Sequence, residues 1–398
     1  MLNIPYKKVL EDHKDKSSEE VQLLGLQRFQ MSTRMRKEDI MNHYGVIIAG
    51  GGGTRFWPLS RRKTPKQLLN LSGKDLLVNE AIDRMATIID KSNIFIVTAG
   101  VQASAMIAAT AGKVLLSNIL AEPVARNTAA CIGYSAMKIF RKFGDGVMII
   151  TPADHYIEDV DTLTQIFEMA ILTAEKEEKL VTIGLKPTFP STGFGYIKYD
   201  LMSDGAVKPV IEFREKPDEE TARKYIEDGS YAWNSGMFIW KVSLILAKLK
   251  EYVPDIYQNL KSIGDAMNTP EEQEVLERVY PNIRKISIDY AVMEPAATKG
   301  EVLVIPGDCG WNDVGSWDML DVLHERDRNG NVLLGDVVAI DTRDTVLYST
   351  FRTVAAIDVE NLILVETPDA VMVCPKNRAQ EVKKIVDILK DNGRNNLL

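Results

Sequence analysis

The sequence predicts an α/β protein in which a Rossmann-like, mostly parallel sheet is followed by a small C-terminal all-β domain. Short apolar runs alternate with segments of helical periodicity, which is typical of parallel strands buried on both faces. The strand-like runs are residues 46–49, 94–98, 147–150 and 181–185, and the helical segments between them are residues 76–89, 128–143 and 162–176. Because such sheets bind ligands at the carboxyl ends of their strands, functional residues are expected there.

The residue pattern changes after about residue 329. Short, β-branched, evenly spaced runs predict an all-β module with tight turns, at residues 332–340, 345–348, 353–358, 362–366 and 370–374. Residues 376–391 then predict an amphipathic helix. We expect a short β-solenoid or a dimerisation element that contributes no obvious chemistry. The expected division is residues 41–328 for the α/β domain and residues 329–398 for the β domain.

Composition limits the classes of partner. The 398 residues include 48 basic and 56 acidic side chains, a formal net charge of −8, which argues weakly against nucleic acid or an anionic membrane. No apolar stretch reaches the 18 residues expected of a membrane span. Three widely separated cysteines fit a reducing compartment and offer no zinc spacing. We therefore expect a cytoplasmic protein.

Residues 1–40 differ from the rest of the chain. They carry eight basic and seven acidic residues and no apolar core, so they predict neither a secretory signal nor an organelle transit peptide. One interpretation is that translation starts at Met41 and the preceding segment is not native. The other is a real N-terminal extension, and the intact mass of the native protein distinguishes the two.

A glycine-rich segment follows the first apolar run. Residues 46–49 lead into Gly50–Gly53, and Arg55 and Lys66 follow. Glycines let backbone N–H groups approach an anion, and basic side chains nearby suit several phosphates. Neither the Walker loop nor the dinucleotide fingerprint matches, since Arg55 stands where the latter needs glycine. Four glycines alone could form a plain tight turn, but the basic residues favour a nucleotide triphosphate site.

Two aspartates are candidate ligands for Mg²⁺. Asp154 follows a buried strand, where a carboxylate could bind the metal or simply cap a helix. Asp313 lies in the sequence Gly-Trp-Asn-Asp-Val-Gly-Ser-Trp, and it is either a second ligand or a capping residue in a tryptophan-packed loop. Two separated carboxylates suit nucleotidyl transfer, in which the protein mainly positions and neutralises charge.

Three further segments could bind substrate. Lys216 could pair with a second phosphate-bearing substrate, although its position in the sequence, considered by itself, is more typical of a solvated surface lysine. Asn234 could bind sugar hydroxyls or mark a kinked strand, and residues 122–128 could read a base or cap a helix. No Ser-His-Asp or Cys-His arrangement is visible, which fits a reaction in which one substrate supplies the nucleophile.

Seven motifs occur together and in order from about Tyr44 onward. They are Ala-Gly-Gly-Gly-Gly-Thr-Arg-Phe-Trp-Pro-Leu-Ser-Arg from Ala49, Pro-Lys-Gln from Pro65, Glu122-Pro123 with Arg-Asn-Thr-Ala from Arg126, Pro-Ala-Asp-His from Pro152, Phe-Arg-Glu-Lys-Pro from Phe213, Trp-Asn-Ser-Gly-Met-Phe from Trp233 and Gly-Trp-Asn-Asp-Val-Gly-Ser-Trp from Gly310. In this order they resemble the sugar-nucleotide pyrophosphorylases, most closely the bacterial mannose-1-phosphate guanylyltransferase branch. Ala130 is a mild departure, since the family usually has proline there.

The resemblance implies a GT-A-like nucleotidyltransferase domain that transfers GMP from GTP to α-D-mannose 1-phosphate with Mg²⁺, by direct in-line attack on the α-phosphate. It implies catalytic roles for Arg55 at the β- and γ-phosphates, Lys66 at the α-phosphate and Lys216 at the sugar phosphate. Metal binding falls to Asp154 and Asp313. Nucleotide binding falls to Ala49, Gly50, Gly51, Gly52, Gly53 and Thr54, with Glu122, Arg126, Asn127 and Thr128 at the guanine, and sugar binding to Gly193, Glu215 and Asn234.

Two alternatives remain open at this stage. The acceptor could be another sugar 1-phosphate, such as a manno-heptose phosphate. The chain could also be a non-catalytic nucleotide-sugar sensor or regulatory subunit, although such proteins usually lose the charged site residues that are present here. The sequence ends without the cupin-like domain of two-function relatives, so isomerase activity is not expected. The C-terminal β module is compatible with a homodimer.

Overall fold

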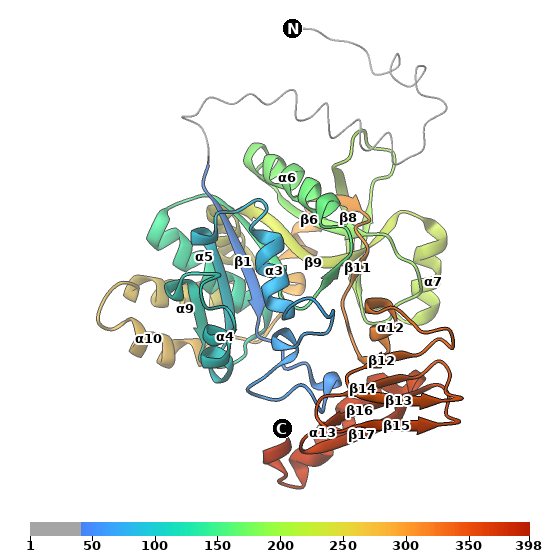
Figure 1. The fold of residues 1–398 in the computed structure, drawn as a ribbon. Helices are drawn as coiled ribbons and strands as arrows, with labels where there is room; N and C mark the ends of the chain where they lie inside the picture. Colours follow the sequence, from blue (N-terminus) through green and yellow to red (C-terminus); the bar gives the residue numbers. More distant parts are fainter. Residues whose placement is uncertain (1–40) are drawn as a thin grey trace.

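The computed structural model describes residues 41–398, so the two interpretations of residues 1–40 lie outside the described part of the chain. A nine-stranded sheet forms the centre of the larger part of the molecule (Figure 1). Its order is β3 (Ile119–Glu122), β2 (Ile94–Ala99), β1 (His43–Ala49), β4 (Val147–Pro152), β9 (Tyr231–Lys241), β6 (Leu180–Leu185), β10 (Val302–Gly307), β8 (Lys208–Glu215) and β7 (Gly195–Tyr199).

The expected α/β class is confirmed, but the sheet is mixed rather than mostly parallel. Strands β3, β2, β1 and β4 are parallel, and β6 and β10 are parallel to each other. The long strand β9 runs antiparallel to β4, β6 and β7. Periodicity marks buried strands without giving their direction, so this reversal was not visible in the sequence.

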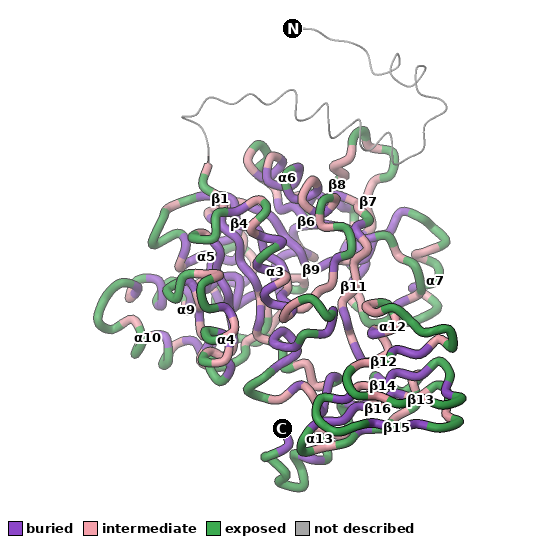
Figure 2. The backbone as a smooth tube through the Cα atoms, in the orientation of Figure 1, coloured by how far each residue is buried: buried purple, intermediate pink, exposed green. Residues whose placement is uncertain are grey.

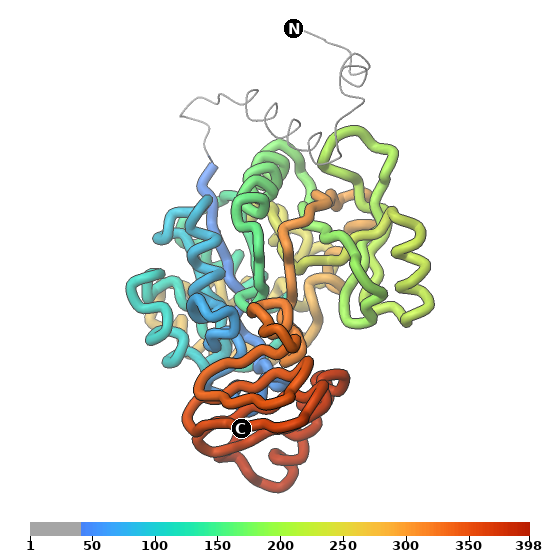
Figure 3. Tube along the Cα trace, turned by 45° about the vertical axis from the view of Figure 1, so that its right-hand side comes forward, coloured from blue at the N-terminus to red at the C-terminus, as the bar shows by residue number. Residues whose placement is uncertain are grey.

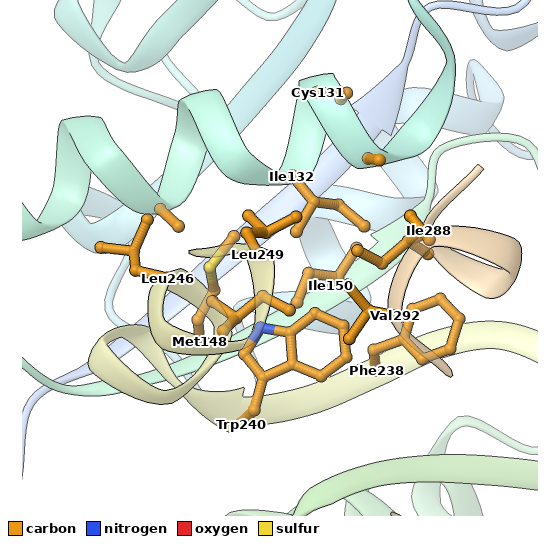
Figure 4. Packing of buried hydrophobic residues seen from close by; sticks show 14 of the residues in the cluster. Cys131, Ile132, Met148, Ile150, Phe238, Trp240, Leu246, Leu249, Ile288 and Val292 are labelled. Atoms are coloured by element: carbon orange, nitrogen blue, oxygen red, sulfur yellow. The ribbon is translucent and has the colours of Figure 1, made fainter. Parts of the chain in front are cut away.

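Helices cover both faces of the sheet, as the continuous apolar strands require. Neighbouring residues of β1 face opposite sides: Val46 belongs to one buried cluster and Ile47 to the other. Helices α5 (Asn127–Phe143), α8 (Val242–Tyr252) and α9 (Pro254–Ala266) pack on the first side, and Figure 4 shows part of that cluster around Trp240. Helices α3 (Leu77–Met85) and α6 (Val160–Lys176) pack on the second.

Four further helices lie around this core: α4 (Ala103–Ala109), α7 (Glu219–Asp228), α10 (Glu272–Val279) and α11 (Glu294–Thr298). The short helix α12 (Leu320–Leu323) packs instead beside the C-terminal part. Figure 2 shows the strands of the central sheet as mostly buried, whereas the outer helices expose one side.

The C-terminal part forms the expected solenoid-like β structure. Strands β12 (Val332–Leu334), β14 (Val346–Ser349) and β16 (Leu362–Thr367) stack in parallel, and β17 (Ala370–Pro375) returns antiparallel to β16. A second parallel pair joins β13 (Val337–Ile340) to β15 (Val354–Ile357). Figure 3 shows these strands as successive layers beneath the larger sheet.

The turns between these layers use residues that tolerate left-handed backbone. Asp341, Asp344, Asp358 and Asn361 all have positive φ, between 45° and 57°. Short polar side chains that bond locally adopt this conformation at the lowest cost after glycine, so the regular Asp and Asn positions explain how the chain turns at each layer.

A third buried cluster joins the two parts of the molecule. It combines Phe56 and Trp57, just after the glycine loop, with Trp317 and with Val382 and Leu389 of the terminal helix α13 (Val382–Asp391). The Trp57 indole donates to the carbonyl oxygen of Leu397 at 2.9 Å, and the Trp317 indole donates to that of Trp57 at 3.0 Å. The C-terminal part therefore supports the segment that follows the glycine loop.

Candidate active site

Asp154 and Asp313 lie close together because two short strands pair. Asp154 follows β4, and β5 (Tyr156–Ile157) then pairs antiparallel with β11 (Trp311–Asn312). This pairing brings the loop that carries Asp313 to the carboxyl end of β4. Both carboxylates line one cavity of about 340 Å³, which we call the phosphate cavity. Its lining comprises Gly53, Thr54, Arg55, Phe56, Lys66, Asp154, His155, Asp313, Gly315 and Lys383.

Lys66 bridges the two aspartate segments. Its ammonium group donates to the Asp154 carboxylate at 2.8 Å and to the backbone oxygen of Asp313 at 2.6 Å. The side chain is only 7% exposed, and its Nζ lies 5.8 Å from the centre of the Phe56 ring. A lysine this enclosed is fixed in position, in contrast to the exposed Arg55 at the mouth of the same cavity.

The two carboxylates differ in proton affinity. Burial would raise the pKa of Asp154, but the charge of Lys66, the hydrogen bond that Lys66 donates and other neighbouring groups together outweigh burial and hold that pKa below its usual value. Burial raises the pKa of Asp313, and the neighbouring Asp154 charge adds to this rise, against the opposing effect of Lys66. The neighbouring groups therefore outweigh burial at Asp154 but not at Asp313, and a further positive charge would stabilise both carboxylates.

The loop after Asp313 holds an uncommon backbone conformation. Val314 has φ +47°, a region that β-branched residues rarely occupy. Its side chain is fully buried in the third cluster with Trp317, and its N–H donates to the Asn312 side chain at 2.7 Å. Packing against the C-terminal part therefore helps to maintain the conformation that places Asp313.

Gln67 fixes the start of the glycine loop. Its side-chain amide is buried and donates to the carbonyl oxygens of Ala49 at 2.5 Å and Gly51 at 3.2 Å. These bonds occupy backbone acceptors and leave the loop N–H groups available to an anion. The sequence signal was the Pro-Lys-Gln motif, but the role of the glutamine could not be derived from it.

Gly53 is the glycine of the loop that most strictly requires its residue type. It has φ +60°, and a Cβ built there would lie 2.3 Å from the Cβ of Lys66. Gly53→Ala is therefore expected to displace Lys66 and lower kcat at least tenfold. A wild-type kcat in Gly53→Ala, with the fold shown to be intact by thermal melting, would contradict this expectation.

A second cavity, of about 350 Å³, adjoins the first and shares Asp154, His155 and Asp313 with it. We call it the sugar-side cavity. It gathers predicted residues from both the nucleotide and the sugar sets: Ala49, Gly51, Thr128, Gly193, Glu215 and Asn234. Residues far apart in the sequence therefore converge where the crevice at the strand ends was expected.

Asp289 belongs to the sugar-side cavity and was missed by sequence reasoning. Its carboxylate accepts a hydrogen bond from the Asn234 amide at 2.8 Å, and burial together with the Glu215 charge raises its pKa. It begins a π-helical turn, Asp289–Met293, and such turns recur at functional sites. No motif around Asp289 distinguishes it in the sequence, so only the fold brings it to notice.

Several predicted residues lie outside both linings. Lys216 is exposed and its ammonium group pairs with the Glu215 carboxylate.

Some of the residues predicted to bind the nucleotide also lie outside both linings. Arg126 donates to the carbonyl oxygen of Pro281, and the Asn127 side chain accepts from the N–H of Thr128 at 2.8 Å. Gly50 and Gly52 also fall outside the linings. Helix α5 begins at Asn127 with Arg126 as its N-cap, and no side chain caps it, so the capping interpretation of Asn127 and Thr128 is wrong.

His155 is held as a neutral acceptor beside the aspartates. The Trp311 indole donates to its Nδ1 at 3.0 Å, and burial lowers the pKa of His155 to about 4. The ring therefore carries no charge near neutral pH. It orients Trp311, which lines the sugar-side cavity.

Glu122 is a buried carboxyl whose titration should affect stability. It is 5% exposed and accepts a hydrogen bond from the Tyr280 hydroxyl, and burial raises its pKa from 4.5 to about 7. Between these two pH values the native state retains a proton that the unfolded chain has released. The free energy of unfolding should therefore fall as pH rises from about 4.5 to about 7, and level off above that.

Glu122→Gln removes this titration and retains an acceptor for Tyr280. Because a tenfold change in proton affinity is worth about 1.4 kcal/mol, the variant should gain on the order of 3 kcal/mol relative to wild type between pH 4 and pH 8. Urea unfolding at a series of pH values measures this difference. Parallel curves for the two proteins would show that Glu122 ionises as readily in the native state as in the unfolded chain.

The fold and these cavities define a class of protein. A glycine loop at a strand end, an enclosed lysine and paired carboxylates are the parts of an enzyme that acts on a nucleotide triphosphate. Among residues 41–398, none of the helices combines the length and apolar character needed to cross a bilayer.

The family comparison agrees with this class. The family model described as nucleotidyl transferase matches residues 44–329, and the chain belongs to that family. A second model, described as a MannoseP isomerase/GMP-like beta-helix domain, matches residues 335–389. The chain is therefore a nucleotidyltransferase with a β-helical C-terminal region.

Two curated proteins and one crystal structure illustrate what the chain is similar to. The chain is 38% identical over 360 residues to the alginate biosynthesis protein AlgA of Pseudomonas syringae pv. tomato, covering 88% of this chain and 72% of that protein. It is also 38% identical to the mannose-1-phosphate guanylyltransferase RfbM of Salmonella typhimurium, covering 89% and 74%. A Thermus thermophilus crystal structure described as a mannose-1-phosphate geranyltransferase superposes with a TM-score of 0.79 at 32% identity, over 88% of this chain and all of that one.

Proposed function

We propose that the chain transfers GMP from GTP to α-D-mannose 1-phosphate, giving GDP-mannose and pyrophosphate. The observation that carries this proposal is the convergence of the glycine loop, Lys66 and two carboxylates on one cavity in a relative of a mannose-1-phosphate guanylyltransferase. A phosphate oxygen of the sugar phosphate forms a bond to the α-phosphorus. The bond from that phosphorus to the β-phosphate oxygen breaks, and pyrophosphate leaves with the electron pair.

The geometry supports a division of roles in this reaction. Lys66 reaches the junction of the two cavities, where charge on the α-phosphate would be stabilised. Arg55 lines only the phosphate cavity, which suits the β- and γ-phosphates. Glu215, Asn234 and Asp289 line the sugar-side cavity, whose carboxylate and amide groups suit sugar hydroxyls. Lys216 is exposed beside Glu215, from which it could reach the phosphate of an incoming sugar.

Mg²⁺ is the metal that this donor set favours. Asp154 and Asp313 would hold it, since Mg²⁺ takes few protein carboxylates and shares its shell with phosphate oxygens and water. No group of three or more histidine, cysteine, aspartate or glutamate side chains suited to a metal is found in residues 41–398. The ion would therefore complete its shell from the substrates. When bound, it neutralises charge on the reacting phosphates.

The guanine base would be recognised by the segment from Glu122 to Thr128. Thr128 lines the sugar-side cavity and accepts from the N–H of Ile288 at 2.8 Å. Glu122 lies beside the glycine loop, since a Cβ built at Gly50 would be 3.2 Å from its carboxylate. Arg126 and Asn127 lie between these two residues in the sequence and would complete the recognition of the base.

The specificity assay pairs GTP, ATP, UTP and dTTP with mannose 1-phosphate, glucose 1-phosphate and a heptose 1-phosphate, and measures pyrophosphate release with Mg²⁺. We expect release with GTP and mannose 1-phosphate only. Release with GTP and the heptose alone would keep the reaction and change the acceptor. If no substrate pair gives pyrophosphate release but the protein still binds GDP-mannose, it would be a nucleotide-sugar sensor instead.

Location and assembly complete the proposal. Three unpaired cysteines fit a cytoplasmic enzyme. We place the division between the two domains after residue 328, with the third buried cluster joining them.

An apolar strip of Val338, Ile340 and Ile357, each about half exposed or more, lies across β13 and β15 and suits a second copy in a homodimer. Val338→Asp should then give a monomer by analytical ultracentrifugation.

A further inference from the structure

One residue of the C-terminal helix lines the phosphate cavity. Lys383, in the first turn of α13, borders it together with Arg55, Lys66, Asp154 and Asp313. It lies far from these residues in the sequence and belongs to the part from which no obvious chemistry was expected. The cavity is therefore built by both parts of the molecule, and its cationic side includes a residue that none of the seven motifs contains.

The position of Lys383 is fixed by its neighbours. Val382 is 2% exposed within the cluster that holds Phe56 and Trp317, and α13 packs on the short helix Thr54–Phe56 that carries Arg55. Just before α13, the Gln380 amide donates to the Ser316 hydroxyl at 2.7 Å, in the loop that follows Asp313. The start of α13 is thus attached to both segments that supply the phosphate cavity.

The charge of Lys383 is not paired with that of any other described residue. Within the described chain its ammonium group has no hydrogen bond or ion pair, whereas that of its neighbour Lys384 pairs with Glu381 at 2.7 Å. Lys66, by contrast, is occupied by Asp154 and by the Asp313 backbone. Arg55 and Lys383 are accordingly the two cationic side chains of this cavity that have no carboxylate partner among residues 41–398.

We propose that Lys383 binds the pyrophosphate end of the nucleotide, both as the β- and γ-phosphates of bound substrate and as the released product. A lysine ammonium group suits this role because it is a compact charge that can follow a phosphate as it moves. The β-helical part is then a component of the active site as well as its support. This inference rests on the proposed function for the identity of the nucleotide, and on the cavity alone for the binding of pyrophosphate.

Calorimetric titration of the full chain with magnesium pyrophosphate tests the inference without any sugar or nucleotide. Lys383→Ala should weaken pyrophosphate binding about tenfold, the effect expected for one charge-assisted hydrogen bond. Lys384→Ala, at the next position and also exposed, should bind as wild type does, and Lys383→Arg should recover most of the affinity. Thermal melting of each variant checks that the fold is unchanged.

The reverse reaction gives an independent readout. With GDP-mannose in excess, Lys383→Ala should raise the KM for pyrophosphate about tenfold and leave the KM for GDP-mannose unchanged. Equal pyrophosphate affinity in Lys383→Ala and Lys384→Ala would overturn the inference, as would a failure of the wild-type chain to bind pyrophosphate. Should the acceptor sugar prove to be different, the calorimetric difference would still stand, so the two proposals fail separately.

Discussion

Lys66→Met is expected to lower the kcat of guanylyl transfer by a factor on the order of 10²–10³, the usual effect of removing one group that stabilises transition-state charge. The ammonium group lies 2.8 Å from the Asp154 carboxylate and 2.6 Å from the Asp313 backbone oxygen, at the junction of the two cavities. Methionine retains an apolar side chain beside Phe56 and removes the charge together with these two hydrogen bonds. Steady-state pyrophosphate release with GTP and mannose 1-phosphate measures the change.

Lys63→Met is the matched control for this experiment. Lys63 is an exposed lysine three positions earlier and lies outside both cavities. Its replacement should leave kcat within about twofold of wild type, as is typical of surface substitutions. Near-normal turnover of Lys66→Met with an intact fold would remove Lys66 from the mechanism and leave it a structural partner of Asp154.

Asp313→Asn is expected to raise the Mg²⁺ concentration for half-maximal activity at least tenfold and to lower the maximal rate. An amide is a neutral and weaker ligand than a carboxylate, so the loss falls on metal binding. Asp154→Asn should have a larger effect on the rate, because it also breaks the ion pair that positions Lys66. Activity measured across a Mg²⁺ titration separates the metal requirement from the maximal rate.

Asp308→Asn provides the comparison, since Asp308 precedes the same loop and lines neither cavity. Its Mg²⁺ titration should coincide with that of wild type. An unchanged titration for Asp313→Asn would count against a metal ligand at this position, and the raised pKa of Asp313 would then reflect burial beside Asp154 alone.

The sequence predicted those parts of the fold that depend on local pattern. The run at 46–49 and the helix at 128–143 are found as β1 and α5, because an apolar run or a helical period reports burial directly. The direction of β9 was not predictable. Its apolar pattern is interrupted at Asn234–Gly236, and Gly236 has φ +69° near a register shift against β6. In the sequence pattern this irregularity resembles the end of a strand, although β9 continues through it.

The site was predictable where a motif carries the chemistry. Lys66, Asp154 and Asp313 each stand in a motif, and the structure brings them to one cavity. Asp289 and Lys383 have no such signal. Asp289 depends on a π-helical turn packed beside Asn234, and Lys383 depends on the C-terminal helix docking on the glycine-loop segment. Both placements follow from tertiary packing, which residue spacing does not encode.

The most direct test of the central claim, direct guanylyl transfer in this cavity, is a single-turnover reaction of enzyme with GTP labelled at the α-phosphate. On addition of mannose 1-phosphate and Mg²⁺, the account predicts labelled GDP-mannose and pyrophosphate in equal amounts. Without the sugar phosphate, it predicts that pyrophosphate is neither released nor exchanged into GTP. Exchange in the absence of sugar phosphate, with label retained on the protein, would contradict direct attack and require a covalent guanylyl-enzyme.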